Sequence, residues 1–339
     1  MCHITSSLRT LDYHTAGEPF RIVVDGIPEI GGRTVAERRI QAQRSPGIDA
    51  CRALLCREPR GHADMYGAFI VPADDPHADF GALFWHNDGY STACGHGTIA
   101  LGVWAVQTGR VEAARDGVTP VTIDVPSGRV VAHVRQDAGT VTGVVFENVA
   151  SYPVARSVGV DTSVGRLFVD LAFGGALYAS VEASDLGLEV KPEHCAKLTK
   201  IGREVKWALN DSEWARHRDD DRLSGVYGTI IFDDLGDTTN GPHQRNVTVF
   251  ADGRVDRSPC GSGTAARLAL LADSGRLGPG QVLTHDSIIG TRFIGRARKA
   301  ASGDGRHAII PEVEGMAYKT GEHTFALEAA DPLDTGFLL

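Results

Sequence analysis

Two stretches of this sequence match each other: CGHGTIALGVWAVQTGRV begins at Cys94, and CGSGTAARLALLADSGRL begins at Cys260. Aligned without gaps, they share the cysteine, the two glycines that follow it, the threonine, an alanine and a distant Gly-Arg pair. Apolar residues recur near helical spacing after each glycine-rich start, and Gly109 and Gly275 suit the ends of helices. The sequence therefore predicts two helices, each with a cysteine just before its N-terminus.

The sequence between and after these stretches is rich in β-branched residues. Such runs stand at 121–125, 129–136, 140–149, 225–233 and 246–252. The first three are separated by Pro-Ser-Gly and Ala-Gly breaks, which are typical of the turns of antiparallel meanders. A further apolar pattern predicts a helix at about 192–210. The fold class that we expect is α+β, with antiparallel sheets around central helices.

The two matching stretches lie about half a chain length apart, which predicts a pseudo-twofold arrangement of two similar lobes. We expect an N-terminal lobe at residues 1–155 that carries Cys94 and a C-terminal lobe at residues 156–339 that carries Cys260. In this arrangement the two cysteine loops face each other across a cleft.

Composition agrees with a folded, soluble protein. Hydrophobic residues make up 42% and charged residues 23% of the 339 residues, and no apolar run approaches the roughly 18 residues that a membrane helix needs. The net charge of −9 is spread along the chain, so nucleic acid is not the expected partner. The first residues lack a secretory pattern, and six irregularly spaced cysteines give no disulfide framework, so we expect a cytoplasmic protein.

The cysteine loops have the composition of a reactive site. A thiol at a helix N-terminus lies at the positive end of the helix dipole, which favours the thiolate. Gly95, Gly97, Gly261 and Gly263 carry no side chains, so the backbone N–H groups of these loops could hold a carboxylate. One thiolate and one thiol on opposite faces of an α-carbon meet the needs of a two-base inversion. No lysine motif indicates pyridoxal phosphate, so we expect a racemase or epimerase without a cofactor or metal.

Other interpretations of these residues stay open. Cys94 and His96 could bind zinc together with His86, although compact ligand spacing is missing. Both glycine patterns match a dinucleotide fingerprint, although polar residues precede them where a strand should stand. The chain could also bind an amino acid without catalysis. The remaining cysteines lack glycine-rich helix starts and are expected to be structural: Cys2, Cys51, Cys56 and Cys195.

Motifs along nearly the whole chain resemble the proline racemase family, which includes proline racemase, 4-hydroxyproline 2-epimerase and trans-3-hydroxy-L-proline dehydratase. These motifs are DYHTAGEP at 12–19, EPRGH at 58–62, DMYG at 64–67, the Cys94 loop, AFGG at 172–175, YGT at 227–229 and DRSPCG at 256–261. The resemblance implies a two-lobed fold of the diaminopimelate epimerase type, with the active site in the cleft and the C-terminal tail returning to the first lobe.

The resemblance also implies roles for single residues. Cys94 and Cys260 match the two catalytic positions of the family. His96 and Asp256 would contact the ring nitrogen of the substrate. Four backbone N–H groups would hold its carboxylate, those of Gly95, Gly97, Gly261 and Ser262.

The choice of substrate is less clear from the sequence. Dehydratases of the family replace the second cysteine with threonine, whereas this chain keeps Cys260, which favours epimerisation of 4-hydroxyproline or racemisation of proline. The segments at 86–92 and 223–229 nevertheless look more like the dehydratase branch, and the segment at 286–290 is similar to the epimerase branch. Dehydration of trans-3-hydroxy-L-proline therefore stays the alternative. The oligomeric state is open, with a homodimer as one arrangement.

Overall fold

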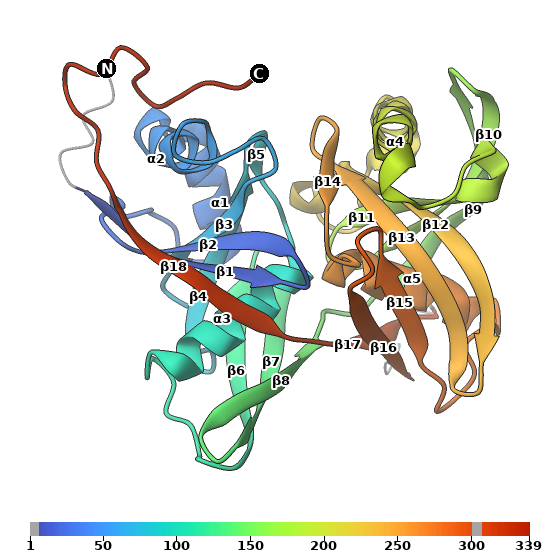
Figure 1. Ribbon diagram of the computed structural model, residues 1–339, viewed down its shortest axis with the longest axis horizontal. Coiled ribbons are helices and arrows are strands. Elements are labelled where there is room, and N and C mark those ends of the chain that lie inside the picture. The colour runs from blue at the N-terminus through green and yellow to red at the C-terminus, as the bar shows by residue number, and fades with distance from the viewer. Residues whose placement is uncertain (1–6, 300–306) are drawn as a thin grey trace.

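The structure is a computed structural model that describes residues 7–299 and 307–339. Figure 1 shows two groups of strands side by side, with helix α3 (Gly95–Gln107) in one group and helix α5 (Gly261–Asp273) in the other. Both helices begin directly after the matching cysteines, as the sequence predicts. The α+β fold class is confirmed.

The first half of the molecule is built from nine strands among the described residues. These are β1 (Leu8–Thr15), β2 (Glu18–Asp25), β3 (Tyr66–Val71), β4 (Phe80–His86), β5 (Gly89–Tyr90), β6 (Gly117–Val125), β7 (Gly128–Asp137), β8 (Thr140–Glu147) and β18 (Ala317–Phe325). Neighbouring strands pair in the order β18-β1-β2-β3-β4-β6-β7-β8, and β5 forms a short hairpin with β4.

The second half repeats this plan. Its strands are β9 (Tyr152–Thr162), β10 (Gly165–Phe173), β11 (Leu177–Glu182), β12 (Val226–Thr238), β13 (Gly241–Phe250), β14 (Arg254–Asp256), β15 (Leu283–Ser287), β16 (Arg292–Lys299) and β17 (Ile309–Gly315). They pair in the order β9-β10-β11-β12-β13-β15-β16-β17, and β14 pairs with β13 as β5 does with β4. The repeat seen around the two cysteines therefore extends to the strands of both halves.

The sheets are mixed, which corrects the expectation that they are antiparallel. Parallel pairs occupy equivalent places in the two halves, β2 with β3 and β4 with β6 in the first, and β11 with β12 and β13 with β15 in the second. Each parallel pair is joined through a helical connection, because a crossover has to bring the chain back before it can run in the same direction. The meander β6-β7-β8 is antiparallel, as predicted.

Helices and short turns fill the crossovers. The remaining α-helices are α1 (Val35–Arg44), α2 (Pro46–Cys56) and α4 (Cys195–Asn210), and the 3-10 turns are η1 (Ala183–Leu186), η2 (Pro192–His194), η3 (Glu213–Ala215) and η4 (Asp221–Leu223). The helix predicted at about 192–210 is thus confirmed as η2 followed by α4. None of the helices in the described part of the chain is long and apolar enough to cross a membrane.

The chain passes between the halves twice. It leaves the first half between β8 and β9, and it returns between β17 and β18, where β18 pairs with β1. Strands β8 and β17 pair with each other, so the two sheets join at this edge. Further along the tail, Phe337 bridges to Glu58 in the first half.

The central helices lie in one continuous core. Ile99 and Val103 of α3 and Leu268 of α5 belong to the same cluster of buried apolar side chains. Gly109 and Gly275 follow the helix ends with φ angles of 68° and 74°, the left-handed conformation that glycine tolerates best. Both predicted helix ends are therefore confirmed, and the packing fixes both helix starts at the boundary of the two halves.

Candidate active site

The N-termini of α3 and α5 touch each other. A Cβ atom on Gly95 would lie 2.6 Å from the Cα atom of Gly261, and a Cβ atom on Gly261 would lie 2.7 Å from the Cα atom of Gly95. Only glycine lets the two backbones approach this closely. This contact brings Cys94 and Cys260, which are distant in the sequence, to one place.

The two thiols line a small cavity together with three more of the predicted site residues. The lining consists of Tyr66, Ala93, Cys94, His96, Tyr178, Tyr227, Thr248, Phe250, Asp256, Cys260 and Ser262. The cavity volume is about 10 Å³, and each cysteine is only 5% exposed. His96, Asp256 and Ser262 thus line the same cavity as the two thiols, while Gly95, Gly97 and Gly261 contribute backbone at the helix starts.

Cys94 lies beside the histidine two positions further along. Its Sγ atom accepts a hydrogen bond from the backbone N–H of Gly97 at 3.3 Å, and it lies 3.5 Å from Nδ1 of His96. His96 is held in turn by Thr15, whose hydroxyl donates to the His96 carbonyl at 2.9 Å. The ring of His96 reaches Asp256, with 3.8 Å between Nδ1 and Oδ2. Residues from both halves therefore meet at the first thiol.

Cys260 has a different backbone conformation and different neighbours. Its φ angle of 62° is uncommon for a residue with a side chain, and such strain persists where surrounding contacts enforce it. Here the N–H of Cys260 donates to Ser258 Oγ at 3.0 Å, and Ser258 in turn donates to Asp256 Oδ1. The Sγ atom accepts from the N–H of Gly263 at 3.4 Å and lies 3.8 Å from the hydroxyl of Tyr178.

A buried polar network supports the loop before Cys260. Asn246 donates from Nδ2 to the Pro259 carbonyl at 2.8 Å and to Nε2 of His285 at 2.6 Å. Nδ1 of His285 lies 2.8 Å from Thr264 Oγ1, which also donates to the Pro259 carbonyl. Burial lowers the pKa of His285 to about 3, so its ring is neutral and each nitrogen has one role. The network explains how a strained cysteine keeps one position.

The electrostatics of the thiols differ from the sequence expectation. Burial raises the pKa of both Cys94 and Cys260 above the ordinary value, and the nearby Asp256 carboxylate adds to this. Hydrogen bonds from Gly97 and Gly263 act in the opposite direction but are outweighed. The expectation that the helix N-terminus alone favours a thiolate is therefore wrong for this compact arrangement, because desolvation is the larger effect.

The sequence interpretation missed the aromatic wall of the cavity. The hydroxyl of Tyr66 lies 2.5 Å from Ser91 Oγ and 3.0 Å from the hydroxyl of Tyr227, and Tyr178 lies 2.7 Å from Ser262 Oγ. Tyr66 and Tyr227 stand at the starts of β3 and β12, equivalent strands of the two halves, and each is followed by glycine. This Tyr-Gly repeat was a signal in the sequence that could have revealed them.

A buried carboxyl group was also missed. Glu18 is fully buried at the start of β2, and its Oε2 atom accepts from the backbone N–H of Arg257 at 2.7 Å. Burial and the neighbouring Asp256 raise the pKa of Glu18 well above its usual range. Among residues 7–299 and 307–339, no group of three or more His, Cys, Asp or Glu is placed to hold a metal ion.

The chain is similar to known proteins along nearly its whole length. A family model described as proline racemase matches residues 10–338. A 3-hydroxyproline 2-epimerase from Burkholderia multivorans is 42% identical over 337 residues, which is 99% of either chain. A trans-3-hydroxy-L-proline dehydratase from Bacillus thuringiensis is 40% identical over 331 residues, which is 97% of either chain.

Solved structures extend the comparison. A hydroxyproline epimerase from Agrobacterium vitis, with bound trans-4-OH-L-proline, has a TM-score of 0.91 at 31% identity and covers 98% of this chain, which covers 96% of that one. A PhzF-family protein from Bacillus anthracis, with a TM-score of 0.58 and 12% identity, shares the fold alone. The match over nearly the full length shows that this chain belongs to the proline racemase family, as its sequence motifs indicate.

Proposed function

We propose that this protein inverts the α-carbon of a proline-type amino acid, with Cys94 and Cys260 as the two acid–base groups and without a cofactor. The observation that carries the proposal is the contact between the N-termini of α3 and α5, which places both thiols on one buried cavity. A single buried cysteine is usually structural, but two at equivalent helix starts suit proton transfer on two faces of one atom.

In this proposal the substrate carboxylate binds at the helix starts. The backbone N–H groups of Gly95, Gly261 and Ser262 are its donors, while the N–H of Gly97 stabilises the sulfur of Cys94, to which it already donates. His96 and Asp256 bind the ring nitrogen. The positive charge of that nitrogen offsets a thiolate in the buried cavity, where burial otherwise keeps both thiols protonated.

The reaction then consists of two proton transfers. One sulfur, as thiolate, removes the α-proton, and the pair of electrons left behind is stabilised through the carboxylate by the backbone donors. The other sulfur, as thiol, gives its proton to the opposite face of the carbon. The product is the mirror-image configuration at that carbon, and the protonation states of the two sulfurs are exchanged.

The substrate that we propose is a hydroxylated proline. Relatives at 40% and 42% identity carry names that refer to 3-hydroxyproline, and one similar solved structure holds trans-4-OH-L-proline. The cavity wall offers hydroxyl groups of Tyr66, Tyr178 and Tyr227, which a ring hydroxyl could join. We place the reaction in the cytoplasm, where thiols stay reduced, and a homodimer stays a prediction.

Dehydration of trans-3-hydroxy-L-proline is the second candidate, favoured by relatives of that name at 40% and 42% identity. In that reaction one thiolate removes the α-proton and the 3-hydroxyl leaves as water, which gives pyrroline-2-carboxylate. The hydroxyls of Tyr178 and Ser262 lie beside Cys260 and could donate the proton to the leaving group. Retention of a second thiol favours inversion instead.

One experiment separates these functions. The protein, dialysed against a chelator and free of pyridoxal phosphate and nicotinamide, is incubated in deuterated water with proline, trans-4-hydroxy-L-proline or trans-3-hydroxy-L-proline. Inversion with one deuterium at the α-carbon supports the epimerase, and loss of water supports the dehydratase. No reaction with any of the three substrates, or a strict need for an added cofactor, would overturn the proposal.

A further inference from the structure

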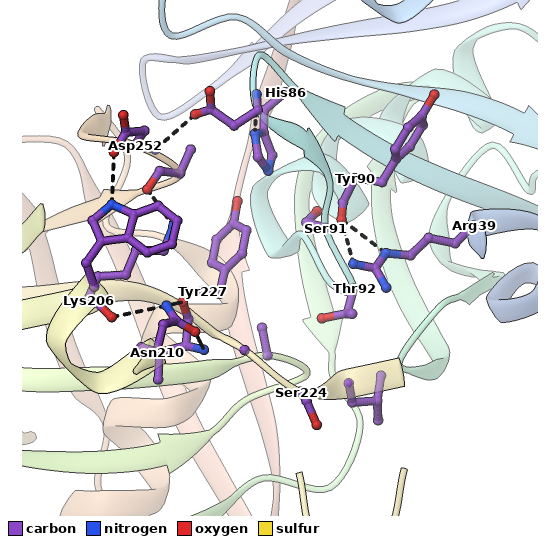
Figure 2. Close-up of a pocket in the computed structure, with 17 residues that line it drawn as sticks. Arg39, His86, Tyr90, Ser91, Thr92, Lys206, Asn210, Ser224, Tyr227 and Asp252 are labelled. Atoms are coloured by element: carbon purple, nitrogen blue, oxygen red, sulfur yellow. Dashed lines mark hydrogen bonds between the residues drawn. The ribbon is translucent and has the colours of Figure 1, made fainter. Parts of the chain in front are cut away.

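A second and larger pocket lies next to the thiol cavity, between the two halves of the molecule. Its volume is about 430 Å³. Figure 2 shows Arg39 and Thr92 of the first half on one side of this space and Lys206 and Asn210 of the second half on the other. The proposed proton transfer uses none of these side chains, so the pocket needs its own explanation. We refer to it as the outer pocket.

Tyr227 borders both the outer pocket and the thiol cavity. The thiol cavity measures about 10 Å³, which is room for one water molecule and far less than a proline ring requires. A substrate therefore reaches the sulfurs only when this wall moves. Figure 2 shows Tyr227 in the middle of the outer pocket, and its hydroxyl is joined to that of Tyr66 at 3.0 Å.

Other contacts that join the halves also border the outer pocket. Arg39 donates to the Arg222 carbonyl at 3.2 Å, from α1 to the segment before β12. The N–H of Asp252 donates to Asp88 Oδ2 at 2.9 Å. These contacts and the hydrogen bond between Tyr66 and Tyr227 must all break if the halves separate here. The interface between the halves would then open into the outer pocket.

Two cations of the outer pocket have no anionic partner among the described residues. Arg39 donates twice to the Tyr90 carbonyl, at 3.0 and 2.8 Å, besides its bond to Arg222. Lys206 donates to the Ala251 carbonyl. Neither forms an ion pair with a carboxylate in residues 7–299 and 307–339. Arg39 therefore contacts backbone carbonyls alone, while the ammonium group of Lys206 contacts a carbonyl and also lies 4.6 Å from the centre of the Trp207 ring.

Two acidic residues, Asp88 and Asp252, also line the outer pocket, and each already accepts hydrogen bonds. The carboxylate of Asp252 accepts from Arg203 at 2.6 Å and from Trp207 at 2.9 Å, and Asp88 accepts the backbone bond described above. Burial lowers the pKa of Lys206 to about 8, while Asp88 and Asp252 act in the opposite direction, so its ammonium group keeps its charge at pH 7. An anion in this space would meet Arg39 and Lys206 together with the carboxylates of Asp88 and Asp252, both of which already accept hydrogen bonds.

We propose that the outer pocket is a capture site for the carboxylate of the incoming amino acid, held between Arg39 and Lys206 before Tyr227 moves and the ligand passes to the two thiols. This inference rests on the proposed function, because it takes the thiol cavity as the destination. The ligand class is a small carboxylate, which such a pair of cations attracts over a distance and concentrates at the opening.

The test compares two alkylating reagents that differ in charge. A thiolate displaces iodide from both iodoacetate and iodoacetamide. The ratio of the two alkylation rates at one sulfur is therefore independent of the fraction of thiolate. This ratio reports how strongly the protein attracts the carboxylate of iodoacetate. At pH 7, with peptide mapping of Cys94 and Cys260, the double variant Arg39→Gln/Lys206→Met is expected to lower the iodoacetate to iodoacetamide ratio about tenfold. No substrate is needed, so failure of this test and failure of the proposed function are distinguishable.

Matched controls lie on the same two helices. Arg44 and Lys200 are exposed residues of α1 and α4, and Arg44→Gln/Lys200→Met changes the net charge equally but away from the pocket. This control should leave the ratio unchanged, and the charge-preserving pair Arg39→Lys/Lys206→Arg should retain it if the side chains act through charge. An unchanged ratio in Arg39→Gln/Lys206→Met, or an equal fall in the control, would overturn the proposal.

Discussion

The two sulfurs occupy unlike surroundings although they begin equivalent helices. Cys94 has an extended backbone with a φ angle of −155° and lies beside His96. Cys260 has a φ angle of 62° and lies near the hydroxyl of Tyr178. We expect this asymmetry to give the two directions of inversion different pH profiles, because each begins with a different thiolate.

The first prediction concerns these residues. Cys94→Ser and Cys260→Ser are each expected to lower inversion by about a thousandfold or more, because a serine hydroxyl is too weak an acid to replace a thiol. Chiral chromatography of the product measures the loss. The matched changes Cys51→Ser, Cys56→Ser and Cys195→Ser should leave turnover of the folded protein within a few-fold. If one of these three is essential while Cys94 or Cys260 is not, the assignment fails.

His285 gives a prediction for stability. The folded state lowers its pKa from 6.5 to about 3, so the unfolded state binds a proton more readily throughout this range. The resulting stability is complete above pH 6.5 and is lost as the pH falls, by at most about 1.4 kcal/mol per pH unit. Urea unfolding at pH 7 and pH 5 should show a shallower decline for His285→Gln than for the wild type. His77→Gln, at an exposed position, should keep the wild-type slope, and equal slopes for all three would contradict this reading.

The contact between α3 and α5 determines the site at the scale of elements. Gly95→Ala or Gly261→Ala places a methyl group within 2.6 or 2.7 Å of the opposite backbone. The helix starts must then separate, which we expect to lower turnover at least tenfold and to destabilise the fold by about 1–3 kcal/mol. The control is Gly47→Ala in α2, where a Cβ atom meets nothing within 4 Å. Unchanged turnover in both variants at the contact would show that the separation of the helix starts does not matter.

Helices α3 and α5 and the meander β6-β7-β8 could be predicted from the sequence, because their signals are local. The cysteine, the glycines and the apolar spacing of α3 and α5 lie within one segment each, and so do the turns of the meander β6-β7-β8. Helices α1 and α2 were not predicted, since α1 in particular is mostly polar and its few buried residues do not form a clear apolar stripe. The parallel strand pairs were not predicted either, because they join strands that are distant in the sequence.

The predicted site residues also have local signals in the sequence, whereas the missed ones depend on contacts between distant segments. These predicted residues stand in the two cysteine segments or directly before the second one, and they line one cavity: Cys94, His96, Asp256, Cys260 and Ser262. The tyrosine wall comes instead from strands outside these segments, and its place at the cavity depends on how whole sheets pair. Outer-pocket residues such as Arg39 and Lys206 lie on α1 and α4, which have no sequence relation to each other.

At the scale of the whole molecule, the two halves are connected by the chain, which crosses from one to the other. The chain crosses after β8 and again after β17, and both crossings flank the paired strands β8 and β17. Away from these crossings in the sequence, Glu18 and Asp64 of the first half each accept a hydrogen bond from Arg257 of the second half. The division into lobes at 1–155 and 156–339 stays a prediction, and the first crossing falls between Glu147 and Tyr152.

A planar ligand tests the central claim, which is that the two sulfurs flank the reacting carbon when the halves close. Pyrrole-2-carboxylate is flat at the ring carbon that bears its carboxylate, as a substrate becomes after it loses its α-proton, and such analogues bind more tightly than substrates do. The measurement is peptide mapping of Cys94 and Cys260 after iodoacetamide treatment, with and without saturating pyrrole-2-carboxylate, and with Cys195 as the internal control. We predict that the analogue protects both sulfurs together and leaves Cys195 unaffected. Unchanged labelling of Cys94 and Cys260 at saturation would contradict the two-thiol mechanism.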